Sequence, residues 1–381
     1  MTDLYRREEP STSELRHDWL SDRWVIIAPQ RTQRPDDFVT IGNADAYAAA
    51  LHNQHQCPFC RGRENETPPP VAVYSDPWLV RVVPNKFPAV NGVQSLKFSG
   101  VDVVRNVLPH ELEDQSVEPP VARQDEVNKP SIDLFHARQV IGAHEVIIES
   151  PLHLCSLTQL DRQTAWLIFR AYRDRLLHWS HCDDIAYAVV FKNVGLDAGA
   201  SLIHTHSQLI ATNILPTDVK RSTERMEHFR RTENACLFCR MAADELEEKV
   251  RIVAQTEDFV AFCPFASRLP SLVTVVPRAH QSAFENTSDE GLEQLAWLVH
   301  RLLRSIEICY PQAAYNYVLH TAPKGSRDSP SFHWRLEIFP RLTRVAGFEW
   351  GSDCFINPLP PELAAQRLRT EGGFGRSTAD S

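Results

Sequence analysis

The chain carries one set of motifs twice, and this duplication constrains its fold more than any other feature. Each half opens with a Cys-x-x-Cys pair, Cys57/Cys60 in the first and Cys236/Cys239 in the second. In each half an apolar strand, a helical segment, a second strand and a histidine-containing strand then follow in the same order. A repeated order of elements is typical of a chain built from two copies of one structural unit. We therefore expect two related α+β units, each a sheet with helices packed against it.

The histidines of the two halves support this alignment, because their spacings agree. His153 and His204 are 51 residues apart, and His280 and His333 are 53 residues apart. We expect strands at 145–149, 185–192, 272–276, 314–320 and 333–339, a helix at 160–179, and a helix capped by Ser288 that runs to residue 306. We place the units at 1–217 and 218–350, followed by an extension and tail at 351–381. Residues 112–133 are polar and contain three prolines, which favours a surface insertion.

Each half also offers four ligands suited to a tetrahedral zinc ion. Two thiolates on one Cys-x-x-Cys turn need two further ligands, and histidine is the usual choice. The two expected sets are Cys57, Cys60, His153 and His204, and Cys236, Cys239, His280 and His333. A redox-active cysteine pair is the weaker alternative, since neither pair opens a βαβ unit. His320 leaves a second metal arrangement open in the second half.

Nine cysteines without a secretory signal are expected to stay reduced. Outside the two pairs, we expect the remaining cysteines to be buried as small apolar side chains. They are Cys155, Cys182, Cys263, Cys309 and Cys354.

A histidine strand in the first half carries the most specific chemistry. Residues two apart on a strand face the same side, so His204, His206 and Gln208 are expected on one face. If His204 binds metal, His206 is held beside it, and a neutral imidazole is a good nucleophile near pH 7. The preceding small residues Gly199, Ala200 and Ser201 offer backbone N–H groups and a hydroxyl to a phosphate.

The second half provides an internal control for this assignment. His333, Arg335 and Glu337 occupy the positions of His204, His206 and Gln208. The metal ligand is kept, but arginine cannot act as the nucleophile. We therefore expect the first half to be catalytic and the second to be structural or to hold substrate.

Composition narrows the classes of partner. The chain has 40 Lys and Arg against 49 Asp and Glu, a net charge of −9, which disfavours a nucleic-acid partner. No apolar run has the roughly 18–20 residues that a membrane helix needs. The charged N-terminal segment does not resemble a signal peptide, so we expect a cytoplasmic protein without membrane contact.

These motifs together resemble the galactose-1-phosphate uridylyltransferase family of the histidine-triad superfamily. The resemblance spans nearly the whole chain. It is carried by residues 23–35, Cys57-Pro-Phe-Cys60, residues 84–89, Phe191-Lys-Asn193, His204-Thr-His-Ser-Gln208 and residues 333–341. It implies two histidine-triad-like repeats, each a mainly antiparallel sheet with packed helices, related by pseudo-symmetry. The second repeat then lacks the nucleophile.

The resemblance also implies a ping-pong nucleotidyl transfer. His206 attacks the α-phosphorus of UDP-glucose, and the UMP group then passes to a hexose 1-phosphate such as galactose 1-phosphate. Gln208 is implied to hydrogen-bond a phosphate oxygen. Further implied substrate contacts are Ser201, Asn193 and Asn85 around the phosphates and ribose, together with Arg31 and Arg34. The family commonly forms homodimers whose active sites are completed across the interface, so we expect a homodimer.

The sequence departs from the family pattern in two ways. Members with an iron site carry His-x-His-x-His where this chain has His333-Trp-Arg-Leu-Glu337, so iron is not expected. The pair Cys236/Cys239 with His280 is similar to a branch with a second zinc, and residues 347–358 are similar to ADP-glucose phosphorylase-like relatives. In those relatives the base is adenine and the acceptor is inorganic phosphate.

The alternative reading is therefore an ADP-sugar phosphorylase or adenylyltransferase with the same histidine chemistry. A third, from another class, is a non-enzymatic nucleotide-binding zinc protein. Against this third reading, the reactive histidine motif is intact in one half only.

Overall fold

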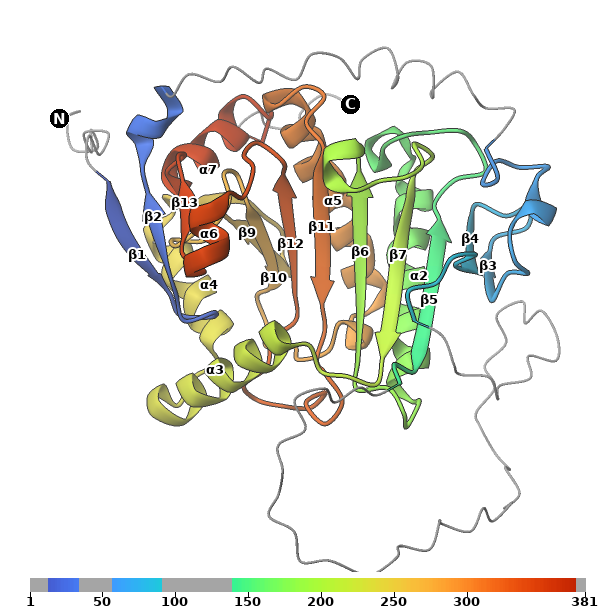
Figure 1. The fold of residues 1–381 in the computed structure, drawn as a ribbon, viewed down its shortest axis with the longest axis horizontal. Helices are drawn as coiled ribbons and strands as arrows, with labels where there is room; N and C mark the ends of the chain where they lie inside the picture. Colours follow the sequence, from blue (N-terminus) through green and yellow to red (C-terminus); the bar gives the residue numbers. More distant parts are fainter. Residues whose placement is uncertain (1–12, 34–56, 91–138, 375–381) are drawn as a thin grey trace, which may run out of the picture.

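A ten-stranded, mainly antiparallel sheet forms the centre of the protein in the computed structural model (Figure 1). The structure describes residues 13–33, 57–90 and 139–374. Arg34, the polar segment at 112–133 and the last residues of the tail lie outside these ranges. The expected α+β class is confirmed.

The order of the strands reproduces the duplication. The first half contributes β3 (Ala72–Tyr74), β4 (Val80–Pro84), β5 (Gly142–Ile148), β7 (His206–Thr212) and β6 (Tyr187–Val194), in that order across the sheet. The second half continues with β11 (Tyr315–His320), β12 (Arg335–Pro340), β10 (Val273–Pro277), β9 (Phe259–Phe262) and β8 (Ile252–Gln255). The second set therefore mirrors the first about the junction between β6 and β11.

This junction was not predicted from the sequence. β6 and β11 pair antiparallel, with Tyr315 opposite Val194 and His320 opposite Val189. Each strand would otherwise be the open edge of a five-stranded sheet, and pairing satisfies the backbone groups of both. The two units thus share one continuous sheet. The unit boundaries at 1–217, 218–350 and 351–381 stay a prediction.

Two long helices, α2 (Arg162–Ser180) and α5 (Asp289–Cys309), pack against the same face of this sheet. Their first turns are capped as the sequence favours: Thr164 N–H donates to the side chain of Asp161, and Gly291 N–H donates to Ser288. Alternate strand residues meet them in one core, such as Leu209 on β7 and Leu336 on β12. The other set of strand side chains, including His206 and Arg335, therefore points to the opposite face.

That opposite face is partly covered at the second half. Helices α3 (Thr217–Glu233) and α4 (Leu237–Glu248) bring Met226 and Phe238 against Phe262 and Val276 of the sheet. Over the first half, Figure 1 shows no described helix in front of β6 and β7 except the short turn that precedes β7.

The two ends of the described chain meet in a small sheet. β1 (Glu14–Asp18) pairs with β2 (Arg23–Ile27), and β13 (Phe355–Asn357) adds to β2 in parallel. Two further helices lie near it, α6 (Gly347–Ser352) and α7 (Pro361–Thr370), and α7 matches the expected helical start of the tail. The 3-10 turns are η1 (Pro29–Gln33), η3 (Glu64–Glu66), η4 (Leu157–Gln159), η5 (Leu196–Ala198) and η6 (Phe284–Asn286).

Two expectations need correction. The histidine strands begin later than predicted, at His206 and Arg335, so His204 and His333 lie in the turns before them. Among the five other cysteines, Cys263 and Cys309 are buried as expected, but Cys155, Cys182 and Cys354 are only partly buried. In the part of the chain that the structure describes, no helix is long and apolar enough to cross a membrane.

Candidate active site and metal centres

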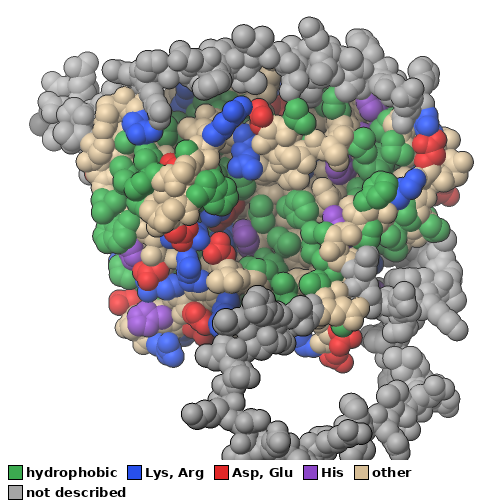
Figure 2. All heavy atoms as spheres, viewed as in Figure 1, with side chains coloured by type: hydrophobic (Ala, Val, Ile, Leu, Met, Phe, Trp, Pro, Cys, Tyr) green, Lys and Arg blue, Asp and Glu red, His purple; other side chains and the backbone are tan. Residues whose placement is uncertain are grey.

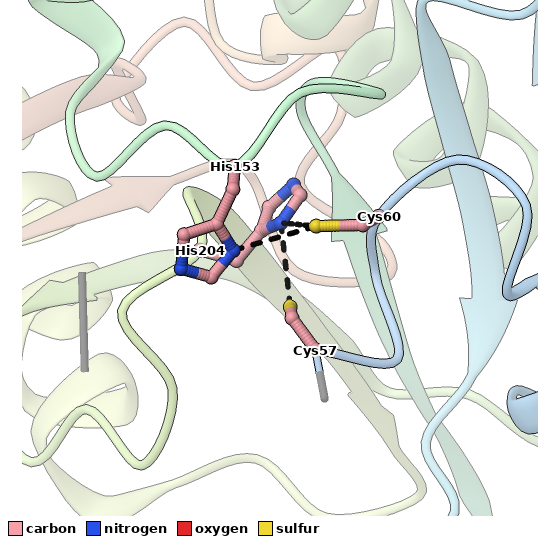
Figure 3. A group of neighbouring side chains, drawn as sticks. All are labelled: Cys57, Cys60, His153 and His204. Atoms are coloured by element: carbon pink, nitrogen blue, oxygen red, sulfur yellow. Dashed lines mark hydrogen bonds between the residues drawn. The ribbon is translucent and has the colours of Figure 1, made fainter. Parts of the chain in front are cut away.

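The first predicted metal set comes together in space (Figure 3). Nδ1 of His204 lies 3.5 Å from Sγ of Cys57 and 3.6 Å from Sγ of Cys60, and Nδ1 of His153 lies 3.4 Å from Sγ of Cys60. One candidate ligand atom from each of the four residues lies within 4.8 Å of all the others. Figure 3 shows the side chains converging, with Cys57 and Cys60 on one turn and His153 and His204 on two other loops.

The second predicted set has the same geometry. Nδ1 of His333 lies 3.6 Å from Sγ of Cys236 and 3.5 Å from Sγ of Cys239, and Nδ1 of His280 lies 3.6 Å from Sγ of Cys239. The four candidate ligand atoms again lie within 4.8 Å of one another. The duplication therefore extends to both candidate metal centres.

These separations fit a tetrahedral ion. With bonds of about 2.3 Å to sulfur and about 2.0–2.1 Å to nitrogen, the sulfur–nitrogen edge of a tetrahedron is about 3.5 Å. The histidines are also in the tautomer that a metal requires. Nε2 of His204 lies 2.9 Å from the carbonyl oxygen of Ser150, and Nε2 of His333 lies 3.1 Å from that of Pro277. A carbonyl can only accept, so each Nε2 carries the proton and each Nδ1 lone pair faces the thiols.

The electrostatics favour the metal-binding form at His204 and Cys236 but not at Cys60 and Cys239, whose thiol pKa values are raised, by burial at Cys60 and by the hydrogen bond with Cys236 at Cys239. Burial lowers the pKa of His204 to about 4, so its imidazole is neutral at pH 7. In the second set, the hydrogen bond from Cys239 lowers the pKa of the Cys236 thiol, against the opposing effect of burial. A neutral imidazole and a thiolate are the forms that ligate zinc.

His206 begins strand β7, directly after the first metal set. Its side chain is buried, and its Nδ1 lies 2.7 Å from the carbonyl oxygen of His204. Nδ1 therefore carries the proton, which leaves the lone pair on Nε2. Burial lowers the pKa of His206 and keeps the ring neutral. The ring of Phe59, from the Cys-x-x-Cys turn, contacts both His204 and His206 at centroid distances of 5.9 and 5.3 Å. The metal turn thus packs against the proposed nucleophile.

A cavity of about 190 Å³ opens beside His206. Of the residues that the sequence singled out, Asn193, Ala200 and Ser201 line it, together with Leu196 at the start of η5, and their roles toward a substrate stay a prediction. Gly199 ends that turn with φ +84°, a left-handed conformation that glycine adopts without strain. Asn316 donates its Nδ2 to Oδ1 of Asn193 and to the carbonyl of Ala198, so it ties the turn to the sheet. This bond fixes the orientation of the Asn193 amide. Its N–H groups are therefore available to donate to a ligand.

Gln208 lies two residues along the same face of β7, and a residue that the sequence did not single out orients it. The N–H of Ala89 donates to Nδ1 of His144, so Nε2 of His144 carries the proton and donates to Oε1 of Gln208 at 2.8 Å. Oε1 is thereby occupied, and the amide N–H groups of Gln208 are available to a bound phosphate. Asn85 also lies in this cluster: its Oδ1 accepts from the N–H of Phe87, and its Nδ2 lies 3.1 Å from Nε2 of His144, a contact between two donors rather than a hydrogen bond.

A buried ion pair beneath β7 was also missed. Lys192 and Glu149 are fully buried and form an ion pair. Lys192 Nζ also donates to Oγ1 of Thr205 at 2.9 Å and to the carbonyl oxygen of His206 at 3.0 Å. The ion pair therefore fixes the backbone of the proposed nucleophile. The available signal was a lysine inside one apolar strand and a glutamate directly after another.

Arg31 lies neither at the cavity nor in the cluster of Asn85, His144 and Gln208. It is exposed in η1, next to the small sheet, and in Figure 1 strands β2 and β7 stand on opposite sides of the molecule. Its role as a substrate contact stays a prediction.

Comparison with known proteins identifies the family. Residues 99–371, more than half of the chain, match the family described as "Domain of unknown function (DUF4921)". Galactose-1-phosphate uridylyltransferase of Thermotoga maritima is 26% identical over 364 residues, which cover 93% of this chain and 98% of that protein. ADP-glucose phosphorylase of Arabidopsis thaliana is 32% identical over 368 residues, which cover 95% of this chain and 93% of that protein. The chain belongs to the galactose-1-phosphate uridylyltransferase family.

Within this family, the chain stands near the ADP-glucose phosphorylase branch. The crystal structure of the Arabidopsis ADP-glucose phosphorylase with bound ADP-glucose superposes with a TM-score of 0.73 at 29% identity, covering 94% of this chain and 98% of that one. The family resemblance inferred from the motifs is confirmed, and so is the histidine-triad-like fold. The prediction that the chain is a nucleotidyltransferase of this family type is confirmed as well. Two Cys/His groups able to hold a metal are also confirmed in the described residues.

Proposed function

We propose that this protein is an ADP-sugar phosphorylase that acts through a covalent adenylyl-histidine on His206. The observation that carries the proposal is the state of the His206 ring. Its Nδ1–H donates a hydrogen bond to the carbonyl oxygen of His204, and its ring lines a cavity together with Ser201 and Asn193. This arrangement leaves the Nε2 lone pair for attack on phosphorus.

The reaction proceeds in two displacements. Nε2 of His206 forms a bond to the α-phosphorus of ADP-glucose, and the bond from that phosphorus to the bridging oxygen breaks, releasing glucose 1-phosphate. An oxygen of inorganic phosphate then attacks the same phosphorus, the nitrogen–phosphorus bond breaks, and ADP leaves. The imidazole keeps its Nδ1 proton throughout, and the carbonyl of His204 stabilises the positive ring of the intermediate.

Three groups around the cavity support the charge on the phosphate. Gln208, held by His144, and Asn193, held by Asn316, both present amide N–H donors. Ser201 adds a hydroxyl, whereas the N–H groups of Gly199 and Ala200, which the sequence offered to a phosphate, already donate to the carbonyl oxygens of Leu196 and Gly195. Donors fixed before the reaction stabilise the transition state without having to reorganise.

The choice of nucleotide rests on sequence similarity. Identity is 32% to the Arabidopsis ADP-glucose phosphorylase and 26% to the Thermotoga uridylyltransferase, over nearly equal lengths. This difference favours adenine over uracil and inorganic phosphate over a hexose 1-phosphate. The second candidate is transfer of UMP from UDP-glucose to galactose 1-phosphate, which the same histidine chemistry would support.

Zinc is the metal that we propose for both Cys/His groups, and iron is not expected in either. The residues that would hold it are Cys57, Cys60, His153 and His204 in the first half and Cys236, Cys239, His280 and His333 in the second. With four protein ligands a site is closed to substrate, so a bound zinc ion supplies structure rather than catalysis. The first site would fix the turn that places His206.

We further propose a homodimer that completes the active site. Arg31 is exposed and distant from the cavity of its own chain, which suits a substrate contact made across an interface. Arg34 follows it in the sequence. We propose a nucleotide sugar and phosphate as partners, with no nucleic acid.

Product analysis tests the proposal. The zinc-loaded protein is incubated with ADP-glucose and phosphate, and separately with UDP-glucose and galactose 1-phosphate, and nucleotides are separated by chromatography. We expect ADP and glucose 1-phosphate in the first reaction, lost in His206→Asn and kept in His228→Asn, a change at an exposed histidine of α3. Turnover of the UDP-glucose pair alone would establish the second candidate. Binding of nucleotides without any turnover would favour the non-enzymatic reading.

A further inference from the structure

A second cavity opens on the same face of the large sheet, in the half that lacks the nucleophile. It has a volume of about 160 Å³, and its inner wall includes Arg268, His320, Arg335 and Glu337. The duplication places Arg335 at the position of His206 and Glu337 at that of Gln208. Arg335 on β12 lies three inter-strand spacings from β7, opposite the level of Ile210, which is four residues from His206. The two residues are therefore roughly 20 Å apart. The two cavities are therefore distinct.

Positive charge dominates the inner wall of this cavity. Both oxygens of the Glu337 carboxylate are engaged, one by Nε of Arg335 at 3.0 Å and the other by Nη2 of Arg268 at 3.2 Å. Nε2 of His320 lies 3.8 Å from the same carboxylate. Two guanidinium groups thus share one carboxylate, which leaves an excess of one positive charge. Figure 2 shows charged side chains of both signs gathered to the left of the centre of this face.

The acidic side chains at the rim of the cavity do not pair with Arg335, because they are engaged by other groups. Arg23 pairs with Asp218 and Asp353, and Arg221 pairs with Asp353 as well. Asp18 is turned toward its own loop, where its carboxylate accepts from the N–H of Leu20 and the hydroxyl of Ser21.

Arg335 has donors that the described residues do not use. Its side chain is only 7% exposed, and its Nε donates to Glu337. Across the described ranges, no hydrogen bond is made by its two Nη nitrogens, while its guanidinium lies 5.4 Å from the ring centroid of Phe238. These two nitrogens are not among the buried unpartnered atoms of the described residues, and Arg335 lines the cavity, so they are open to it. A guanidinium in this state, next to a cavity, is suited to an acceptor that comes from outside the chain.

We propose that this cavity binds a small oxyanion, either inorganic phosphate or the phosphate group of a sugar phosphate. Arg335 and Arg268 would donate to it, since a guanidinium matches the geometry of phosphate oxygens. Two guanidinium groups would repel a cation, so a metal ion is excluded as the ligand of this wall. The site is separate from the proposed catalytic cavity, and it does not depend on which nucleotide the enzyme uses.

Calorimetric titration of the zinc-loaded, full-length protein with inorganic phosphate tests the proposal. Arg335→Gln is expected to lose one phosphate site relative to the unchanged protein. Glu337→Gln is expected to bind at that site about tenfold more tightly, because it removes the charge that competes for both guanidinium groups. Arg344→Gln, at an exposed arginine, is the matched control and should leave the titration unchanged.

Arg335→Gln should abolish phosphate binding at this site and Glu337→Gln should strengthen it. An ion pair with a purely structural role would not give these opposite effects on phosphate affinity. If Arg335→Gln keeps the same number of phosphate sites, the proposal is overturned. If Arg335→Gln does not fold, Glu337→Gln decides: phosphate affinity that is unchanged or weaker overturns the proposal. A parallel titration with glucose 1-phosphate distinguishes the two sources. Tighter binding of glucose 1-phosphate at the Arg335-dependent site identifies a sugar phosphate, and equal or weaker binding identifies inorganic phosphate.

Discussion

Replacing Lys192 with methionine should destabilise the protein far more than a typical substitution. Lys192 and Glu149 are fully buried, and Lys192 Nζ donates to Glu149, to Oγ1 of Thr205 and to the carbonyl oxygen of His206. Lys192→Met leaves the Glu149 carboxylate in the interior with hydroxyl donors but no cation. Removing one partner of a buried ion pair costs about 3–5 kcal/mol. We expect the free energy of unfolding to fall by that amount.

A double-mutant cycle isolates the contribution of the pair. Glu149→Gln alone leaves the buried ammonium of Lys192 unpaired, and its cost should be similar. The double substitution contains no unpaired charge, so its cost should be at least about 2 kcal/mol below the sum of the single costs.

The pH dependence of the Lys192→Met variant gives a second test. Burial raises the pKa of Glu149, but the charge of Lys192 together with the hydrogen bonds from Lys192, Ser207 and Thr205 holds the pKa below its ordinary value. The native pair therefore stabilises the fold above the ordinary carboxyl pKa, and this is lost as the pH falls through the lowered value. Without Lys192, burial is opposed only by the hydroxyl donors Ser207 and Thr205, and the pKa of Glu149 rises. The cost of Lys192→Met should then shrink as the pH is lowered from about 7 to about 5.

Urea unfolding of the zinc-loaded variants, followed by tryptophan fluorescence, measures these changes. Lys220→Met, at an exposed lysine of α3, is the control and should change the free energy of unfolding by less than about 0.5 kcal/mol. Strict additivity of the two single changes, or a cost for Lys192→Met as small as that of the control, would refute the reasoning.

Three further predictions concern other parts of the molecule. Cys57→Ser and Cys236→Ser should each lower the zinc content of the purified protein from two ions per chain to one, measured by elemental analysis; an unchanged content would exclude that ligand set. His144→Phe frees the amide of Gln208 to rotate, and should lower kcat about tenfold or more without a matching rise in KM. Equal changes in both constants would show that the residue acts in binding. Ser288→Ala removes the N-cap of α5 and should lower the free energy of unfolding in urea by about 1 kcal/mol. An unchanged free energy would show that the cap does not stabilise the fold.

Both candidate metal centres could be predicted from the sequence because their ligands are defined by residue type and spacing. Two cysteines three apart lie on one turn, and the duplicated spacing from His153 to His204 and from His280 to His333 selects their partners. The placement of Ser201 and Asn193 near His206 followed from the family resemblance, and the cavity confirms that they lie together.

The groups that the sequence did not reveal act through long-range packing. Lys192 looks anomalous inside an apolar strand, but its partner Glu149 lies 43 residues earlier, directly after β5, a strand that does not adjoin β6. His144 meets Gln208 only because β5 pairs with β7, with His144 opposite Ile210. The β6–β11 junction depends on the pairing of two edges, which local patterns do not encode.

Intact mass measurement under alkaline denaturing conditions, which preserve phosphohistidine, tests the central claim most directly. The protein is mixed with ADP-glucose, and separately with UDP-glucose, without any acceptor. The account predicts that ADP-glucose adds one adenylyl group per chain, that phosphate removes it, and that His206→Asn does not acquire it. An added uridylyl group alone would reassign the nucleotide. No covalent adduct from either sugar nucleotide, in protein that binds them, would contradict the histidine mechanism.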